Sequence, residues 1–366
     1  MVRGIGRTVR YVRSWMNGTD VDVSEVMIDR QGSQIPATFV VPEGDGGPYP
    51  AWVVMGGITR MGRRHPQLLR FQRALASCGF AVLVPEVPEW QELRVAPHVT
   101  IPTIRAGIAA LRERPEAKPG KVGLVGFSFG APMIVLASII EDLAAQIAGV
   151  ALFGGYSDLE RTLRCSLTGA HEWQGVNQRL SPDPVGRWVL ASNYLTDAPG
   201  YEDASDVADA LHQLARVAGD LRVRGWDPQH DALKRELRLG IAPERRELYD
   251  LFARPTTDPA PDDDACAPVA TALADAVRRA EPLLDPGRHL SKVRTPVTLI
   301  HGRDDRLVPY TESLRFHECL PDSLESDVTI TGLFSHTAGL APASLSSRVR
   351  ESLVFLQAMR RVLTTV

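Results

Sequence analysis

Three segments far apart in the sequence carry side chains that together could perform nucleophilic catalysis. Ser128 is the middle residue of a Gly-Phe-Ser-Phe-Gly run at 126–130, and His336 lies close to the C-terminal end. Asp304 and Asp305 stand side by side in a third segment. Because a serine hydroxyl is a weak nucleophile at neutral pH, it needs a base, and the base needs an acid to orient it. The chain therefore contains the residue types of a Ser-His-Asp triad.

The residues around Ser128 are typical of a sharp turn from a strand into a helix. An apolar run, Val122–Phe127, precedes the serine, and Pro132 fits the first turn of a helix expected at 132–140. Such a turn strains the serine backbone and leaves no room for side chains two residues before and after it. Gly126 and Gly130 meet that need. The alternative is an ordinary glycine turn with an idle serine.

The elements that must position these residues alternate between apolar strands and helical patterns. Strands are expected at 49–57, 80–88, 121–128, 147–158, 295–305 and 326–332, and helices at 65–79, 100–115, 132–140 and 346–363. Nearly continuous apolar strands indicate a mostly parallel sheet covered by helices on both faces. Only the segment 21–44, with Gln31-Gly32 at its centre, reads as an antiparallel hairpin.

The pattern changes between Leu159 and His289, where the apolar strand runs disappear. Amphipathic helices are expected at 206–221, 231–241, 244–255 and 270–284, with a loop rich in proline and aspartate at 254–268. The chain thus divides into a basic amphipathic segment (1–20), the first part of an α/β core (21–158), a helical insertion (159–289) and the second part of the core (290–366).

In an open α/β sheet, reactive groups gather in the loops that follow the carboxyl ends of the strands. Ser128, the Asp304-Asp305 pair and His336 each follow a predicted strand. Their chain order is serine, aspartate, histidine. From these residues alone, either aspartate could be the acid.

Four segments resemble the α/β-hydrolase superfamily, and the resemblance covers most of the chain outside 159–289. GFSFG resembles the nucleophile elbow, and GLFSHT resembles the segment with the catalytic histidine, His336. HGRDDRLVP resembles the family's H-G-x-x-D-x-x-V-P segment and aligns the acid on Asp305. PYPAWVVMGG resembles the strand before the oxyanion loop. The hairpin and the strand at 80–88 look most like the dienelactone-hydrolase and acyl-peptidase-like branches.

The resemblance implies an α/β-hydrolase fold whose inserted helices form a cap over the active site. It implies a hydrolase that cleaves a carboxylic ester or related small acyl substrate without a cofactor. Phe129 would donate one backbone N–H to the oxyanion. The second donor would be Gly57 or Ile58, since the loop reads Met-Gly-Gly-Ile where the family often has His-Gly.

Several alternatives stay open. A peptidase, a thioesterase or an acyltransferase would use the same triad, and a non-catalytic binding protein could use the same scaffold. A serine at position 128 argues against dienelactone hydrolase activity itself, because that enzyme has a cysteine nucleophile. The alternative to a cap is a set of inserted helices that serves dimerisation in a homo-oligomer.

Composition limits the other classes of function. The net charge of -3 gives no general attraction to nucleic acid. The four cysteines are scattered, without zinc spacing, which is typical of free thiols in the cytoplasm; no metal site is expected. No apolar run is long enough for a membrane span.

The N-terminal segment alternates arginines with apolar residues and has no acid before Asp20. It lacks the uninterrupted apolar stretch of a signal peptide. We expect a helix that packs on its own domain or on a partner, or one that lies on a membrane surface. The arginines are Arg3, Arg7, Arg10 and Arg13.

Overall fold

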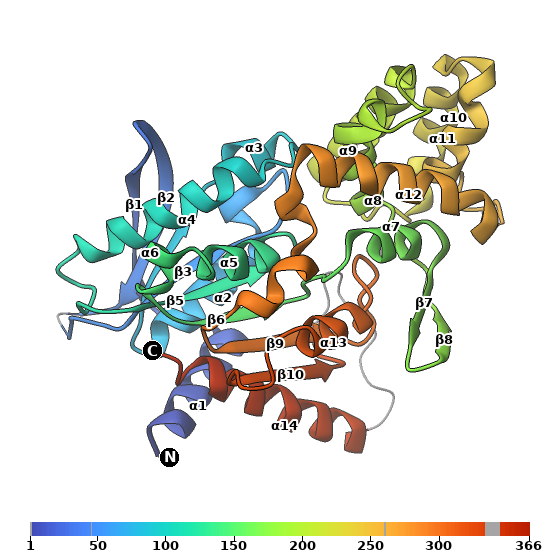
Figure 1. The fold of residues 1–366 in the computed structure, drawn as a ribbon. Helices are drawn as coiled ribbons and strands as arrows, with labels where there is room; N and C mark the ends of the chain where they lie inside the picture. The colour runs from blue at the N-terminus through green and yellow to red at the C-terminus, as the bar shows by residue number, and fades with distance from the viewer. Residues whose placement is uncertain (1, 45, 260, 334–344) are drawn as a thin grey trace.

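The computed structural model describes residues 2–44, 46–259, 261–333 and 345–366, and its centre is a twisted sheet (Figure 1). The eight strands run in the order β1-β2-β4-β3-β5-β6-β9-β10. β1 and β2 form an antiparallel hairpin, β2 pairs with β4 antiparallel, and every later pair is parallel. The mostly parallel sheet predicted from the sequence is confirmed. Its strands are β1 (Val21–Arg30), β2 (Ser33–Pro42), β3 (Ala51–Met55), β4 (Ala81–Pro85), β5 (Val122–Phe127), β6 (Ile147–Phe153), β9 (Val297–Gly302) and β10 (Ser326–Thr331).

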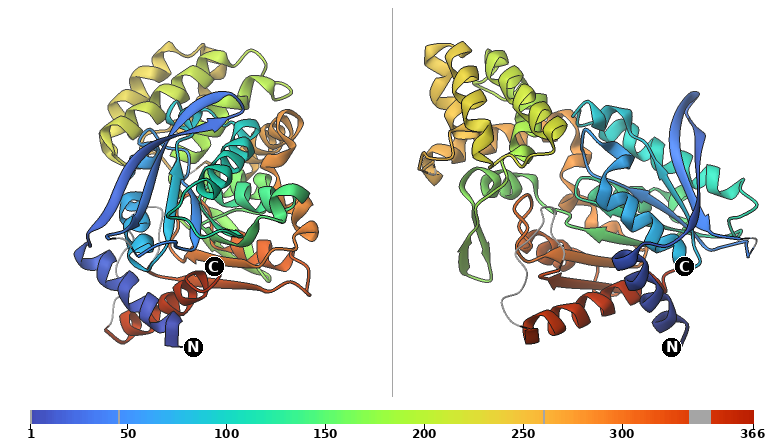
Figure 2. Two further views of the ribbon diagram at one scale, coloured as in Figure 1. Left: turned by 90° about the vertical axis from the view of Figure 1, so that its left-hand side faces the viewer. Right: turned by 180° about the vertical axis from the view of Figure 1, so that it is seen from behind.

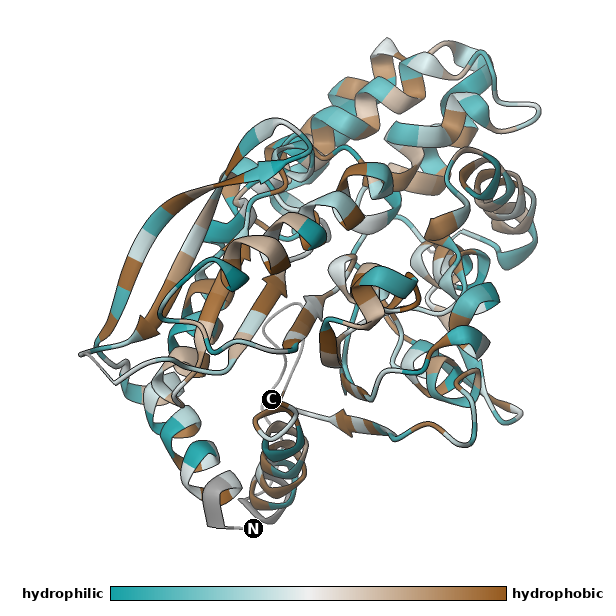
Figure 3. Cartoon of the chain, turned by 60° about the vertical axis from the view of Figure 1, so that its left-hand side comes forward, coloured by the Kyte–Doolittle hydropathy of each residue, from teal (hydrophilic) through white to brown (hydrophobic). Residues whose placement is uncertain are grey.

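Helices cover both faces of the sheet, so the strands are apolar on both sides (Figures 2 and 3). In β3, Trp52 and Val54 join one buried cluster with α2 and α14. Val53 and Met55, which alternate with them, join a second cluster with α4 and α5. The layered helices are α1 (Val2–Asn17), α2 (Pro66–Ser77), α4 (Pro97–Arg112), α5 (Gly130–Ser138), α13 (Thr311–Glu318) and α14 (Leu345–Val362), with short α3 (Pro88–Gln91) and α6 (Glu141–Ala144).

Between β6 and β9 the chain forms the inserted helices. They are α7 (Leu159–Thr168), α8 (Val185–Tyr194), α9 (Ser205–Leu221), α10 (Asp231–Gly240), α11 (Arg246–Ala253) and α12 (Asp263–Ala280). Two expectations were wrong here. A two-stranded hairpin, β7 (Ala170–Trp173) with β8 (Val176–Arg179), interrupts the helices. The loop expected at 254–268 ends early, because Asp262 caps α12 by accepting from the Asp264 N–H.

The inserted helices contact loops that leave the carboxyl ends of three core strands. After β3, Arg60 bonds Asp220 of α9 at 2.8 Å. After β4, the Val95 N–H donates to Asn193 of α8 at 3.1 Å. After β9, the Arg306 carbonyl accepts from the Asp183 N–H at 2.8 Å. The insertion therefore stands at the edge of the sheet where the predicted reactive residues lie (Figure 1).

No helix among the described residues is long and apolar enough to cross a membrane. The four cysteines are free thiols, with Cys78, Cys165 and Cys266 buried and Cys319 exposed.

Candidate active site

Ser128 occupies the turn between β5 and α5 in a left-handed backbone conformation, with φ of 51°. Such a conformation is uncommon for a residue with a side chain, and two backbone hydrogen bonds fix it here. The Ser128 N–H donates to the Phe153 carbonyl at 2.8 Å, and the Ser128 carbonyl accepts from the Ala131 N–H at 3.0 Å. The serine is only half-buried. The strained turn expected from the sequence is present.

The two flanking glycines are required by close backbone contacts. A Cβ on Gly126 would stand 2.5 Å from the Gly130 carbonyl oxygen. A Cβ on Gly130 would stand 2.2 Å from the Gly56 carbonyl oxygen. Carbon and oxygen do not approach this closely without a bond, so any larger residue would push the turn apart. Gly130 thus also lets the loop after β3 lie against the start of α5.

That loop brings Gly57 beside the serine. A Cβ on Gly57 would be 3.0 Å from the Ser128 Cβ and 3.4 Å from the Ser128 Oγ. Among the described residues, the backbone N–H groups of Gly57, Ile58 and Phe129 have no hydrogen-bond acceptor. Phe129 also stands at the N-terminal end of α5, where the helix dipole favours negative charge. The turn at Ser128 and the loop after β3 thus form a corner in which backbone N–H groups beside the serine hydroxyl could donate to an anion.

A buried carboxyl group holds the loop after β3 in place. Glu86, just after β4, accepts from the Arg63 N–H at 3.3 Å and from Gln91 at 3.2 Å. Burial raises the pKa of Glu86, an effect that Arg63 opposes. A Cβ on Gly62 would fall 2.2 Å from the Glu86 Oε1, so this loop and this carboxyl are tightly packed.

Asp305 is buried directly after β9, whereas Asp304 is exposed. The Asp305 Oδ1 accepts from the Leu307 N–H at 2.9 Å and from the Val308 N–H at 3.1 Å. These bonds fix the plane of the carboxylate. Of the two aspartates, only Asp305 is therefore held in a fixed orientation, and its role as the acid stays a prediction.

His301 lies against Asp305 and is wholly buried. Its Nε2 is 3.0 Å from the Val308 carbonyl and 3.5 Å from the Asp305 Oδ2, while its Nδ1 is 2.7 Å from the Ser313 Oγ. Because a carbonyl only accepts, Nε2 must carry a proton. His301 therefore supports the carboxylate of Asp305 from within the core.

The third predicted residue, His336, lies outside the described residues. The structure does describe β10, which ends at Thr331 and pairs with β9. β6 alone separates β5 from β9, which places the strands carrying Ser128 and Asp305 about 10 Å apart. The structure thus brings Ser128 together with Gly57, Ile58 and Phe129, and it places Asp305 at the same edge of the sheet.

Sequence reasoning missed Glu312, which ties the core to the insertion. This carboxylate is buried on α13 and accepts from the Ser157 N–H at 3.0 Å, the Ser157 Oγ at 2.8 Å and the Asp158 N–H at 2.9 Å. Arg161 of α7 pairs with it at 2.8 Å. No local signal could reveal this contact, because Glu312 and Ser157 are 155 residues apart.

Trp226 lies where the insertion meets the loop of Asp305. The guanidinium of Arg306 stands over its ring at 4.6 Å, and that of Arg224 stands over it at 5.1 Å. Both distances are typical of cation–π contacts. A half-buried aromatic ring therefore stands where the insertion contacts this edge of the sheet.

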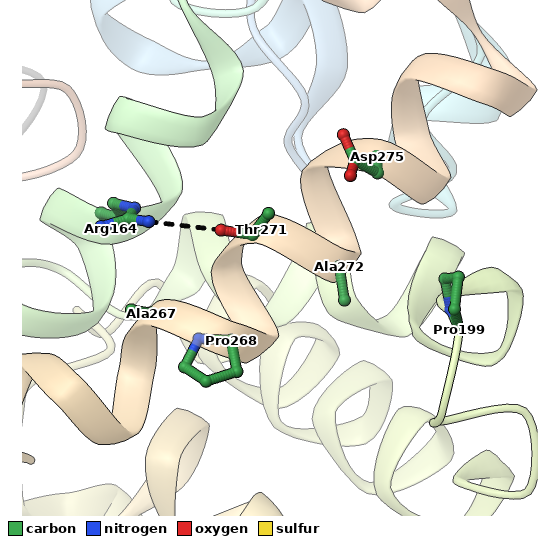
Figure 4. A pocket seen from close by; sticks show the side chains of 7 residues that line it. All are labelled: Arg164, Pro199, Ala267, Pro268, Thr271, Ala272 and Asp275. Carbon is green, nitrogen blue, oxygen red and sulfur yellow. Dashed lines mark hydrogen bonds between the residues drawn. The ribbon is translucent and has the colours of Figure 1, made fainter.

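A separate hollow of about 460 Å³ opens on the insertion, between α7 and α12 (Figure 4). Arg164 crosses it to reach Thr271 at 3.3 Å. None of the predicted catalytic residues lines it; its walls are Arg164, Pro199, Ala267, Pro268, Thr271, Ala272 and Asp275. Among the described residues, no group of three or more His, Cys, Asp or Glu side chains is arranged to hold a metal ion.

No protein-family model and no curated protein matches this sequence. Solved structures do match it in the path of the backbone. An acylaminoacyl peptidase from Pyrococcus horikoshii is 15% identical with a TM-score of 0.48; the match covers 93% of this chain but only 41% of that one. Est1E from Butyrivibrio proteoclasticus is 12% identical with a TM-score of 0.48, over 92% and 99% of the chains. A 2-hydroxy-6-oxo-6-phenylhexa-2,4-dienoate hydrolase from Rhodococcus sp. strain RHA1 is 14% identical with a TM-score of 0.47, over 93% and 100%.

The structure of this chain has the features by which its fold is assigned. A parallel sheet with an antiparallel N-terminal edge, helices on both faces and a serine turn between β5 and α5 are the marks of the α/β-hydrolase fold.

Proposed function

We propose that this chain, which has the α/β-hydrolase fold, is a serine hydrolase that cleaves a carboxylic ester or a related small acyl compound through an acyl-enzyme. The observation that carries the proposal is the corner at Ser128. There a half-buried hydroxyl on a strained turn lies beside backbone N–H groups that have no acceptor among the described residues. Donors fixed in advance around a reacting atom are the main device for stabilising a tetrahedral oxyanion.

In the proposed reaction, His336 takes the proton of the Ser128 hydroxyl as the oxygen attacks the carbonyl carbon. The N–H of Phe129 and that of Gly57 or Ile58 donate to the oxyanion. Asp305 orients His336 and stabilises its charged form. The histidine then gives its proton to the departing alkoxide. Water, deprotonated by the same histidine, attacks the acyl carbon, and the histidine returns that proton to the Ser128 Oγ as the acyl–oxygen bond breaks, which releases the acid. These steps need no cofactor.

We further propose that residues 159–289 form a cap that closes the site and shapes the acyl or alcohol pocket. The contacts with the loops after β3, β4 and β9 support this role. Trp226, with the Arg306 guanidinium over its ring, lies at the same contact between cap and core.

The acid and the nucleophile can be tested together on nitrophenyl esters. Ser128→Ala should abolish turnover. Asp305→Asn should lower kcat about 10⁴-fold, because an amide favours the wrong tautomer of the histidine. Asp304→Asn is the matched control. The carboxyl of Asp304 is exposed and adjacent in sequence to Asp305, and its loss should leave kcat unchanged. A large loss in Asp304→Asn with little in Asp305→Asn would reassign the acid.

The acyl class requires a panel of substrates. Nitrophenyl esters of increasing chain length, thioesters and acyl-peptides, compared by kcat/KM, separate an esterase from a thioesterase or a peptidase. We expect the highest kcat/KM on an ester. A higher value on an acyl-peptide with the same dependence on Ser128 would keep the triad and overturn the ester assignment.

A further inference from the structure

Helix α1 has two apolar faces, and only one of them is covered. On the inner face, Tyr11 is buried, stacks on Trp15 and meets Phe71 of α2 edge-on. The outer face carries Ile5, Val9 and Met16, which are 53%, 62% and 72% exposed. Their spacing of four and seven residues aligns them along one side of the helix. We call these three side chains the outer stripe.

Helix α14 packs against α1 and also exposes apolar side chains. The two helices pack together, since the Arg7 guanidinium of α1 donates to the Leu363 carbonyl at 2.8 Å. α14 exposes Val349 and Leu353 to solvent. Five of the eleven exposed large apolar side chains of the described residues thus lie on these two helices. The three on α1 share one side of that helix, and an exposed apolar face of this kind marks an interaction surface.

The helices α1 and α2 carry only positive charges. Neither α1 nor α2 contains an aspartate or a glutamate. Arg10 and Arg13 of α1 and Arg73 of α2 are exposed and form no salt bridge among the described residues. Arg70 of α2 lies over the Trp15 ring at 5.4 Å, which places it next to α1.

Two arginines of the inserted helices are, in contrast, paired with nearby acids. Arg238 pairs with Asp250 at 2.7 Å, and Arg245 pairs with Asp206 at 2.8 Å. The cations beside α1 therefore remain uncompensated in a chain whose net charge is -3.

We infer that the α1 face, with its outer stripe and flanking arginines, docks on an anionic lipid surface. Apolar side chains along a helix insert into the boundary between headgroups and acyl chains, and arginines beside them attract anionic headgroups. A second copy of the chain fits less well, because a symmetric contact would bring two basic faces together. Figures 1 and 2 place α1 and α14 on the side away from α9–α11, so docking would leave the candidate active site accessible.

Flotation with vesicles tests the inference on the full-length chain. Vesicles of phosphatidylcholine mixed with phosphatidylglycerol are compared with vesicles of phosphatidylcholine alone, at low and high salt. We expect flotation with the anionic vesicles only, weakened by salt. The double variant Val9→Glu/Met16→Glu should bind at least about tenfold more weakly, and Arg10→Gln/Arg13→Gln should lose most of the salt-dependent binding.

The control is Leu239→Glu, which replaces the most exposed of these apolar side chains, on α10 of the insertion. It should float like the wild type, and all variants should keep wild-type ester turnover. The inference is wrong if the wild type fails to float with anionic vesicles at low salt, or if Leu239→Glu loses as much binding as Val9→Glu/Met16→Glu. A concentration-dependent dimer that Val9→Glu/Met16→Glu dissociates would assign the face to a second copy instead.

Discussion

The contact between Gly130 and the Gly56 carbonyl makes the fit of the oxyanion loop testable by adding one methyl group. In Gly130→Ala, the new Cβ would start 2.2 Å from the Gly56 oxygen and 3.1 Å from the Met55 Cβ. Side-chain Cβ atoms in proteins essentially never come closer than 3.0 Å to another heavy atom. The loop after β3, or the start of α5, must therefore move by about 0.8 Å. Gly57 follows Gly56 directly, so its N–H would move away from Ser128.

The size of the effect follows from that displacement. A misplacement of about 1 Å costs on the order of 10²-fold in rate, and losing an oxyanion donor costs a similar factor. We therefore expect kcat/KM on a nitrophenyl ester to fall about 100-fold in Gly130→Ala. Overpacking should also lower stability by about 1–3 kcal/mol.

A graded series controls for the substitution itself. Gly240→Ala, where an added Cβ has no neighbour within 4 Å, should match the wild type. Gly57→Ala, whose Cβ would lie 3.0 Å from the Ser128 Cβ, should fall between the two. Circular dichroism establishes that each variant is folded before kinetics are compared. A folded Gly130→Ala within about threefold of wild-type kcat/KM would refute the reasoning about this contact.

Two further predictions concern the insertion. Glu312→Ala should lower the free energy of unfolding by about 2–4 kcal/mol, because it leaves the N–H groups of Ser157 and Asp158 without their acceptor, whereas the exposed Arg161 keeps Asp158 as a partner. Thermal unfolding should show no such loss for Glu318→Ala, an exposed position on the same helix. Asp206 should stabilise the fold in a pH-dependent way. Hydrogen bonds from Arg245 lower the pKa of this carboxyl, so its stabilisation is present above the unfolded pKa near 4 and is lost as the pH falls through the folded pKa. Asp206→Asn should therefore lower the free energy of unfolding by about 1 kcal/mol at neutral pH. Urea unfolding should show that the difference between wild type and variant shrinks in acid. A difference that is the same at both pH values would exclude the ionic contribution.

The sequence could predict the elements with strong local signals. Apolar runs located all the parallel strands, and the glycines around Ser128 predicted its strained turn. The hairpin β7–β8 was missed, although its turn is Gln174-Gly175. The same dipeptide, Gln31-Gly32, marked the turn of the first hairpin. In both turns the glutamine and the glycine adopt positive φ. The strands around Gln174 are short and partly exposed, so no apolar alternation drew attention to them.

The start of α12 was misplaced for a related reason. Proline and aspartate were read as loop residues, yet Asp263 and Asp264 occupy the first turn, where negative charge stabilises a helix. Pro268 lies only one turn further in and removes a single backbone bond. Contacts such as Glu312 with Ser157 depend on the folded arrangement of distant segments, so the sequence alone could not predict them.

Labelling with a fluorophosphonate probe tests the central claim most directly. The probe bonds covalently to a serine only where a base activates the hydroxyl and an oxyanion site receives the phosphoryl oxygen. We expect wild-type protein to bind one probe per chain, with mass spectrometry placing it on Ser128, and Ser128→Ala to bind none. A wild type that stays unlabelled, or a Ser128→Ala variant that labels equally well, would contradict the assignment of Ser128 as the nucleophile.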